Sequence, residues 1–188
     1  MSLRRAGRFG TAAIVAALTA TAPAFPATAS TAPDLRAAMA ACRQDAGGAS
    51  TSLHLSPNRR SVYVGSPGGP LQTQIRRGAA VRVTATGKIS YGGLFNWRGT
   101  WGPKGNGDTA PNSRSWPFPG GPDAALVGLW NHAGTNVRIG ADSGCMLVPK
   151  QTIATAPYGL WLSANDDDIS DNGDKGYDIR VRAWLIQR

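Results

Sequence analysis

Two stretches of the chain alternate apolar and polar residues with a period of two, and this pattern constrains the fold more than any other. Residues 81–85 read Val-Arg-Val-Thr-Ala, and Ile89 and Tyr91 keep the same phase. Residues 177–183 read Tyr-Asp-Ile-Arg-Val-Arg-Ala and alternate as clearly. Because successive side chains of a strand point to opposite faces, each stretch predicts a β-strand with one buried and one solvent-facing side.

Shorter apolar runs separated by Gly and Pro predict further strands. We expect them at residues 61–64, 71–75, 125–130, 137–139, 146–148 and 159–164. Many short strands divided by turn residues are typical of an antiparallel β-sandwich. The predicted fold class is therefore all-β, with one short N-terminal helix over residues 30–46 that Ser30 or Thr31 caps and Gly47-Gly48 ends.

The N-terminal segment predicts export. Residues 1–29 combine an arginine-containing start, a short apolar run and an Ala-Thr-Ala cleavage pattern, which together are typical of a secretory signal peptide. An uncleaved anchor is the alternative, although the run falls short of the ~20 apolar residues that a membrane-spanning helix needs. We expect a secreted or periplasmic protein without a membrane span, in which a helical segment at 30–50 precedes a sandwich at 51–188.

The chain has two cysteines, Cys42 and Cys145. An even number of cysteines in an exported chain favours a disulfide, and two cysteines allow one intramolecular pairing. Such a bond would tie the N-terminal segment to the body of the protein. Two free, buried thiols are the alternative.

An acidic loop at residues 165–176, NDDDISDNGDKG, stands out in a chain of net charge +9. All eleven acidic residues are Asp, and six of them fall between residues 166 and 178. Repulsion among these carboxylates would be offset by a cation, and Ca²⁺ accepts about 6–8 oxygen ligands of this kind. Ile179 stands where an EF-hand needs Glu, which excludes that motif. A solvated acidic turn is the equal alternative on residue chemistry.

Three fragments in order carry a family resemblance: GKISYGG followed by WGPKGNGD, then ALVGLW, then GLWLSANDDDISDNGDKGYDIRV. Together they span roughly residues 61–183, and the arrangement resembles the bacterial calcium-dependent galactose-binding lectins of the PA-IL-like family. The resemblance implies a galactose-binding-like jelly-roll sandwich. It also implies a non-enzyme that uses Ca²⁺ as cofactor and takes a glycan or small sugar as partner.

The resemblance also implies site residues. The calcium ligands would be Tyr91 through its backbone carbonyl, Asp166, Ser170 (or Ile169), Asp171 and Asn172. The sugar would meet Tyr91, Trp101, Asn106, Asp108, Asp166 and Asn172. Residues 106–112 contain none of the His that the galactose binders place after WGPKG, which leaves the identity of the sugar open. A homo-oligomer would raise the avidity of such a single-site lectin.

A second hypothesis keeps the sandwich and treats calcium as a structural clip only. Binding would then use a basic face built from Arg59-Arg60, Arg76-Arg77 and the alternating Arg180 and Arg182, with anionic surfaces or polymers as partners. A solvated surface is the alternative for these arginines. No nucleic-acid motif accompanies the charge, so we expect no nucleic-acid partner.

Three tryptophans, Trp97, Trp101 and Trp116, lie in a Gly- and Pro-rich stretch at 92–122. They would either stack on a sugar ring or plug the end of the sandwich. A hydrolase is a minor hypothesis, because Ser143 in Gly-Ala-Asp-Ser-Gly lacks a recognisable catalytic His partner.

Overall fold

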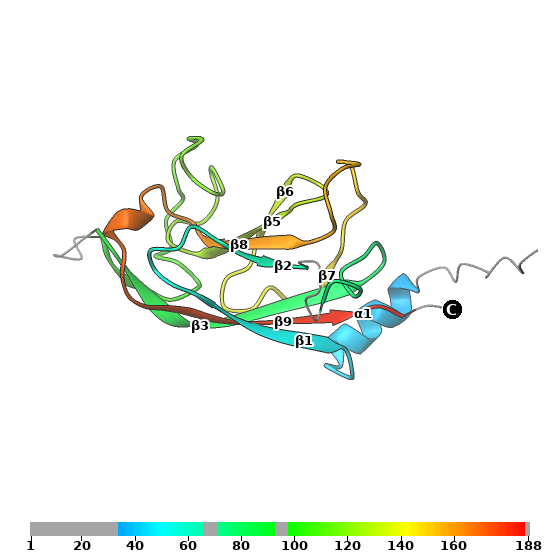
Figure 1. The fold of residues 1–188 in the computed structure, drawn as a ribbon. Coiled ribbons are helices and arrows are strands. Elements are labelled where there is room, and N and C mark those ends of the chain that lie inside the picture. The colour runs from blue at the N-terminus through cyan, green and yellow to red at the C-terminus, as the bar shows by residue number, and fades with distance from the viewer. Residues whose placement is uncertain (1–33, 66–70, 93–97, 187–188) are drawn as a thin grey trace, which may run out of the picture. The chain divides into compact units, whose positions relative to one another are not determined.

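The computed structural model describes residues 34–65, 71–92 and 98–186. The predicted signal peptide, the expected helix caps Ser30 and Thr31, and Trp97 lie outside the described residues. Residues 31–188 form one compact unit, and the ribbon within it consists of two facing sheets with one helix at an end (Figure 1).

The strands form two antiparallel sheets, which confirms the predicted β-sandwich. The larger sheet has the order β1-β9-β3-β4, with β7 also paired to β3. Its strands are β1 (Ala49–Leu55), β3 (Ala80–Tyr91), β4 (Gly99–Trp101), β7 (Met146–Leu147) and β9 (Gly173–Trp184). The smaller sheet has the order β2-β8-β5-β6. Its strands are β2 (Val62–Val64), β5 (Leu126–Trp130), β6 (Thr135–Arg138) and β8 (Leu160–Ala164).

The core lies between the sheets and follows from the period-two pattern. In β3 and β9 the apolar positions of the alternation, such as Val81, Val83, Ile179 and Val181, are buried in one cluster. Leu162 belongs to the same cluster from the smaller sheet. The intervening polar side chains of β3 and β9 therefore face solvent on the outer side of the larger sheet.

Two glycines allow β3, the start of β9 and the end of β1 to lie close together. Gly87 and Gly176 both have positive φ, +98° and +88°. A Cβ at Gly87 would collide with the carbonyl oxygen of Gly176, and one at Gly176 would collide with that of Leu55. Only glycine fits both the conformation and the space.

The helix α1 (Leu35–Arg43) is shorter than predicted and has a different cap. Asp34 precedes its first residue, and its carboxylate accepts a hydrogen bond of 3.0 Å from the Ala37 N–H. Asp34 takes the place of the expected caps Ser30 and Thr31, because its side chain reaches the free N–H groups of the first turn. The helix packs against β3, β7 and β9.

The predicted disulfide Cys42–Cys145 is confirmed, and it joins α1 to the segment before β7. Cys42 lies in a small apolar cluster with Ala38, Ala80 and Trp184. The bond therefore fixes the N-terminal segment to the start of β3 and the end of β9.

One expected strand is wrong, and two strands of the structure were not predicted. Residues 71–75 form a turn, in which the Ile75 N–H bonds the Leu71 carbonyl at 3.0 Å. Leu71 and Ile75 are both buried, because residues four apart in such a turn point the same way. β1 and β4 were not predicted, since β1 alternates small polar residues with only Leu53 and Leu55 as strong apolar markers.

Among the described residues, the one α-helix is far too short to cross a membrane.

Candidate functional site

The acidic loop connects β8 to β9 at the end of the sandwich opposite α1 (Figure 1). It contains a single 3₁₀ turn at Ile169–Asp171. The Asp168 carboxylate starts this turn by accepting hydrogen bonds from the Ser170 N–H at 3.0 Å and the Ser170 hydroxyl at 2.5 Å. These bonds stabilise the ionised form and lower the pKa of Asp168. The loop thus has a defined internal structure.

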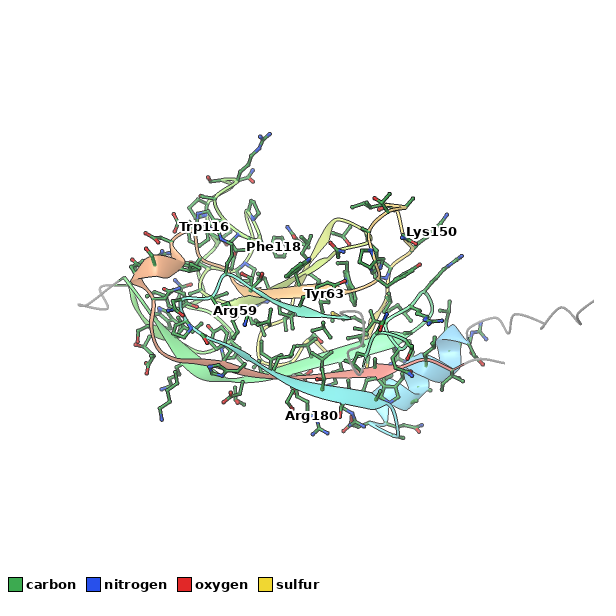
Figure 2. The ribbon with its side chains drawn as sticks, viewed as in Figure 1. Arg59, Tyr63, Trp116, Phe118, Lys150 and Arg180 are labelled. Carbon is green, nitrogen blue, oxygen red and sulfur yellow. A yellow bond between two sulfur atoms is a disulfide. The ribbon has the colours of Figure 1, made fainter. Side chains whose placement is uncertain are left out.

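Asn165 anchors the start of the loop. Its side chain is fully buried, donates to the carbonyls of Phe118 and Pro122, and accepts from the Phe118 N–H at 2.9 Å. The Asn165 backbone also donates to the Ala125 carbonyl at 2.8 Å. The acidic loop and the long Gly- and Pro-rich segment are therefore joined at one amide, and Figure 2 shows Phe118 and Trp116 at this end of the molecule.

Arg98 forms the centre of an ionic cluster next to Asn165. Its guanidinium lies 3.1 Å from Asp166 Oδ1, 3.2 Å from both oxygens of Asp123 and 3.6 Å from Asp167. Asp166 is 2 % exposed and Asp123 8 % exposed. The guanidinium also lies 5.4 Å from the centre of the Trp116 ring. One arginine thus pairs with two buried carboxylates and one exposed carboxylate, so the acidic groups outnumber the positive charge in this cluster.

The second oxygen of Asp166 has no hydrogen-bond partner among the described residues, although it is buried. The same is true of Asn172 Oδ1, whose amide nitrogen donates to the Pro57 carbonyl at 3.3 Å. Burial raises the pKa of Asp166 to about 6, against the opposing influence of the nearby Asn172 amide and Arg98. Two buried oxygens without a hydrogen-bond partner are costly unless a donor or cation reaches them, and the Asn172 amide is one such donor when its nitrogen is turned toward Asp166.

Two predicted sugar-contact residues belong to the same cluster. Asn106 donates to Asp123 Oδ2 at 2.8 Å, so it is connected to Asp166 through Asp123 and Arg98. The Asn106 amide oxygen accepts from the Asp108 N–H at 2.8 Å. Asp108 itself is exposed. The structure therefore brings Asn106, Asp108 and Asp166 to one end of the sandwich.

Tyr91 is buried, and its side chain is used for structure. Its hydroxyl meets the Tyr177 hydroxyl at 2.9 Å and donates to the Ala124 carbonyl at 3.0 Å. Burial raises the pKa of Tyr91 above its usual value and that of Tyr177 to about 12. The Tyr91 carbonyl, the expected metal ligand, accepts the Arg98 N–H at 3.3 Å and keeps a second lone pair.

The tryptophans have different roles. Trp116 is buried with 6 % exposure and closes this end of the sandwich over Arg98, which matches the plug alternative. Trp101 is half-buried, packs against the core and donates its indole N–H to the Arg98 carbonyl at 2.7 Å. The indole N–H of Trp101 is therefore already engaged by the fold.

The remaining predicted metal ligands lie in the 3₁₀ turn. Ser170 is exposed and its hydroxyl is bonded to Asp168, whereas Asp171 is half-buried. Among the described residues, no group of three or more His, Cys, Asp or Glu side chains gathers in metal-binding geometry. The predicted set contains two carboxylates only, those of Asp166 and Asp171, with amide, hydroxyl and carbonyl oxygens making up the rest.

Sequence reasoning missed Arg98, Asp123 and Asn165. Arg98 and Asp123 are separated by 25 positions in a segment without periodic pattern, and only the fold brings them together. Asn165 had a signal, because it immediately precedes the run of three Asp residues. For the hydrolase hypothesis, the Ser143 hydroxyl donates to the carbonyl of the next residue, Gly144, and accepts from the Val83 N–H of β3, so both contacts tie the segment to the fold.

No family model matches the chain, and no curated protein matches it. Among solved structures, the fold is similar to one titled "EclA N-terminal domain; PllA-like lectin". That likeness covers 73% of this chain and 96% of that chain, with 15% sequence identity and a TM-score of 0.41. At this level the likeness carries no argument about binding, so the functional argument rests on the site.

Proposed function

We propose that the chain is an exported, calcium-dependent carbohydrate-binding protein with its site at the acidic end of the sandwich. The observation that carries the proposal is the pair of buried, unpartnered oxygens, Asp166 Oδ2 and Asn172 Oδ1. Both belong to the loop that gathers the carboxylates of a basic chain. Buried polar atoms without partners are rare in folded proteins. A bound cation accounts for both oxygens at once, whereas an Asn172 amide turned toward Asp166 would pair them but lose its 3.3 Å hydrogen bond to the Pro57 carbonyl.

The donor set fits a hard cation at these two residues. Carboxylate and amide oxygens are the ligands that Ca²⁺ prefers, and the family resemblance would add oxygens of the Tyr91 carbonyl, Ser170 and Asp171. Arg98 already pairs with the other oxygen of Asp166, which leaves Oδ2 for the ion. When bound, Ca²⁺ would neutralise the loop and accept hydroxyl oxygens of a sugar.

Side chains of the ionic cluster would orient the sugar. Asn106 and Asp108 lie at the partly exposed margin of the cluster, where an amide and a carboxylate can bond ring hydroxyls. Asp123 holds Asn106 in place, and Arg98 holds Asp123. The chain of contacts from Arg98 to Asn106 therefore positions the outer groups before any ligand arrives.

Calorimetry tests the proposal directly. The purified protein, freed of metal with EDTA and dialysed, would be titrated with CaCl₂ and then with a panel of monosaccharides. We expect saturable calcium binding at one site, and sugar heat in the calcium-loaded sample alone. Equal sugar heat with and without EDTA would contradict the calcium requirement, and the absence of both heats would contradict the whole proposal.

Matched variants locate the site. Asp166→Asn removes one carboxylate charge and should weaken calcium binding by at least about tenfold, because a charged ligand is lost. Asp178→Asn removes the same charge from β9, where Asp178 is exposed and bonds His54 at 2.9 Å. The control should bind calcium as the unmodified protein does. Equal weakening in both variants would show a general charge effect.

The alternative, a calcium-stabilised non-catalytic module that binds anionic polymers, has one observation in its favour. The side chain of Arg180 on β9 makes no hydrogen bond or ion pair with any described residue, and Figure 2 shows it pointing away from the sandwich. Its neighbours Arg82 and Arg182 pair with Asp142 and Asp45, which reduces the net charge of this face. Calcium binding without sugar heat in the same titration would favour this alternative.

A further inference from the structure

A row of apolar side chains crosses the outer face of the smaller sheet. The antiparallel register places Tyr63 opposite Trp161, and Trp161 opposite Leu129. Val62 and Val64 on either side of Tyr63 are buried in the core, so Tyr63 points outward. Trp161 is 38% exposed and Leu129 36% exposed, and both line a cavity of about 300 Å³.

The exposed indole of Trp161 is held in one orientation. Its ring centre lies 4.6 Å from that of Tyr63, with the planes inclined by 42°. Its Nε1–H donates to Asn131 Oδ1 at 3.4 Å. Tyr63 in turn donates from its hydroxyl to the Tyr158 carbonyl and packs where a side chain at Gly159 would collide with it. An aromatic surface fixed in this way loses little conformational entropy when a ligand binds.

Positive charge flanks this aromatic surface. Arg60 lines the cavity, and the Ser163 hydroxyl, also in the lining, donates to the Arg60 carbonyl at 2.6 Å. Arg138 is exposed and lies opposite Val127, a lining residue, so both side chains belong to the same face. Within the cavity lining and the four strands of this sheet, no described residue is acidic.

We propose that this face is a second saccharide-binding site, specific for a sugar ring that carries a carboxylate, such as a residue of an anionic polysaccharide. The apolar C–H face of a pyranose would lie on Trp161, where an aromatic face removes it from water. Arg60 and Arg138 would bind the carboxylate, because guanidinium groups match carboxylates in shape and charge. The site is separate from the acidic loop and does not depend on calcium.

The charge argument selects this occupant over a neutral sugar. A neutral ring would use Trp161 but would leave two uncompensated arginines beside it with no gain in binding. An anionic ring uses both features at once, and its approach is favoured by the local positive potential. Without calcium the acidic loop would not bind such a ligand, since the carboxylates of the loop would repel the carboxylate of the sugar.

The test measures binding of trigalacturonate in buffer containing EDTA, and compares it with the methyl-esterified trisaccharide, which keeps the rings and loses the charge. We expect saturable binding of the charged form, weakened by salt, and at least about tenfold weaker binding of the ester. Trp161→Ala should weaken binding of the charged form by about tenfold or more, and Trp161→Phe by less. A cooperative thermal unfolding transition shows that each variant is folded.

Arginine variants complete the test and remain informative if Trp161→Ala fails to fold. Arg60→Gln and Arg138→Gln should each weaken binding several-fold, whereas Arg180→Gln on the opposite sheet should leave it unchanged. Asp166→Asn should also leave it unchanged, which separates this site from the proposed calcium site. The proposal is overturned if trigalacturonate does not bind saturably, or if the acid and the ester bind equally well. It is also overturned if Arg180→Gln weakens binding as much as the Arg60 and Arg138 variants do. It is also overturned if the native mass doubles with concentration and Trp161→Ala abolishes the doubling, because the face would then join two copies.

Discussion

The guanidinium of Arg98 bridges Asp166 and Asp123, 3.1 Å from the first carboxylate and 3.2 Å from the second. The two aspartates come from segments 43 residues apart, and both are nearly buried. Two buried negative charges are tolerated here because a positive charge is built into the chain beside them. The acidic end therefore does not depend on a metal ion alone for its neutralisation.

The Arg98→Gln variant should be less stable by about 2 kcal/mol, measured by urea denaturation in EDTA. The change leaves Asp123 and Asp166 without their ion-pair partner in a buried setting, which is costly. The side chain of Arg98 is 25% exposed, so the loss should fall below that of a fully buried pair. If the loop binds calcium, added CaCl₂ should restore part of the lost stability.

The control for this variant is Arg180→Gln, which removes the same charge from an exposed position on β9. Surface changes of this kind usually alter the free energy of unfolding by less than about 0.5 kcal/mol. An equal loss in both variants would show that net charge, and not the Arg98 bridge, determines the effect.

Loss of the disulfide should lower the free energy of unfolding by about 4 kcal/mol. The bond between Cys42 and Cys145 closes a loop with a sequence separation of 103, and a cross-link of that length removes much entropy from the unfolded chain. The measurement is denaturation of the Cys42→Ser/Cys145→Ser double variant beside the oxidised protein. Reduction of the unmodified protein with dithiothreitol should produce the same loss. A double variant as stable as the oxidised protein would contradict this account.

The sequence was sufficient for the elements whose pattern is local. The alternation at Val81 and at Ile179 predicted β3 and β9, the longest strands, because burial of one face imposes the period directly. The cysteine count predicted the bond between Cys42 and Cys145. The two strands depend on residue type and spacing within a few positions, and the disulfide depends on the fact that two cysteines allow one intramolecular pairing.

The ionic cluster could not be predicted, because it depends on distances between segments. Nothing in the residues around Arg98 shows that Asp123 and Asp166 will meet it, and the pairing exists only after both loops have closed. The row of Tyr63, Trp161 and Leu129 has the same origin. It is set by the register of three strands, which no single segment encodes.

Gly176→Ala should lower the free energy of unfolding by more than about 2 kcal/mol. Gly176 has φ of +88°, and a Cβ there would collide with the Leu55 carbonyl oxygen, so both strain and overlap oppose the change. Gly107→Ala is the matched control, with φ of +97° and open space around the added Cβ. The free energy of unfolding of Gly107→Ala should fall only by the cost of a positive φ for a residue with a Cβ, about 1 kcal/mol. Equal losses in urea denaturation would show that the close approach of β9 to β1 contributes nothing.

His132 should make the protein less stable as the pH falls below about 6.5. Its ring is fully buried beside Tyr158, with ring centres 4.2 Å apart. Nε2 lies 3.1 Å from the Pro149 carbonyl, and Nδ1 accepts the Gly159 N–H at 3.4 Å, so the neutral ring with its proton on Nε2 satisfies both contacts. Burial lowers the pKa of His132, although the Pro149 carbonyl, which can accept a hydrogen bond from the charged ring as well, opposes that shift.

The sign follows from the proton balance. With the pKa of His132 lowered in the folded state, the unfolded chain takes up the proton first, so each step of acidification below about 6.5 favours unfolding. Protonation in the folded state would place a second N–H against that of Gly159 and break the contact. Urea denaturation at pH 7.5 and pH 5.5 should show a loss of about 1 kcal/mol that is smaller in His132→Gln.

Asp166 contributes with the opposite sign, because its raised pKa makes the folded state take up the proton first. Both the unmodified protein and His132→Gln contain Asp166, so its contribution cancels when their pH dependences are subtracted. An unchanged pH dependence in the variant would contradict the role given to His132.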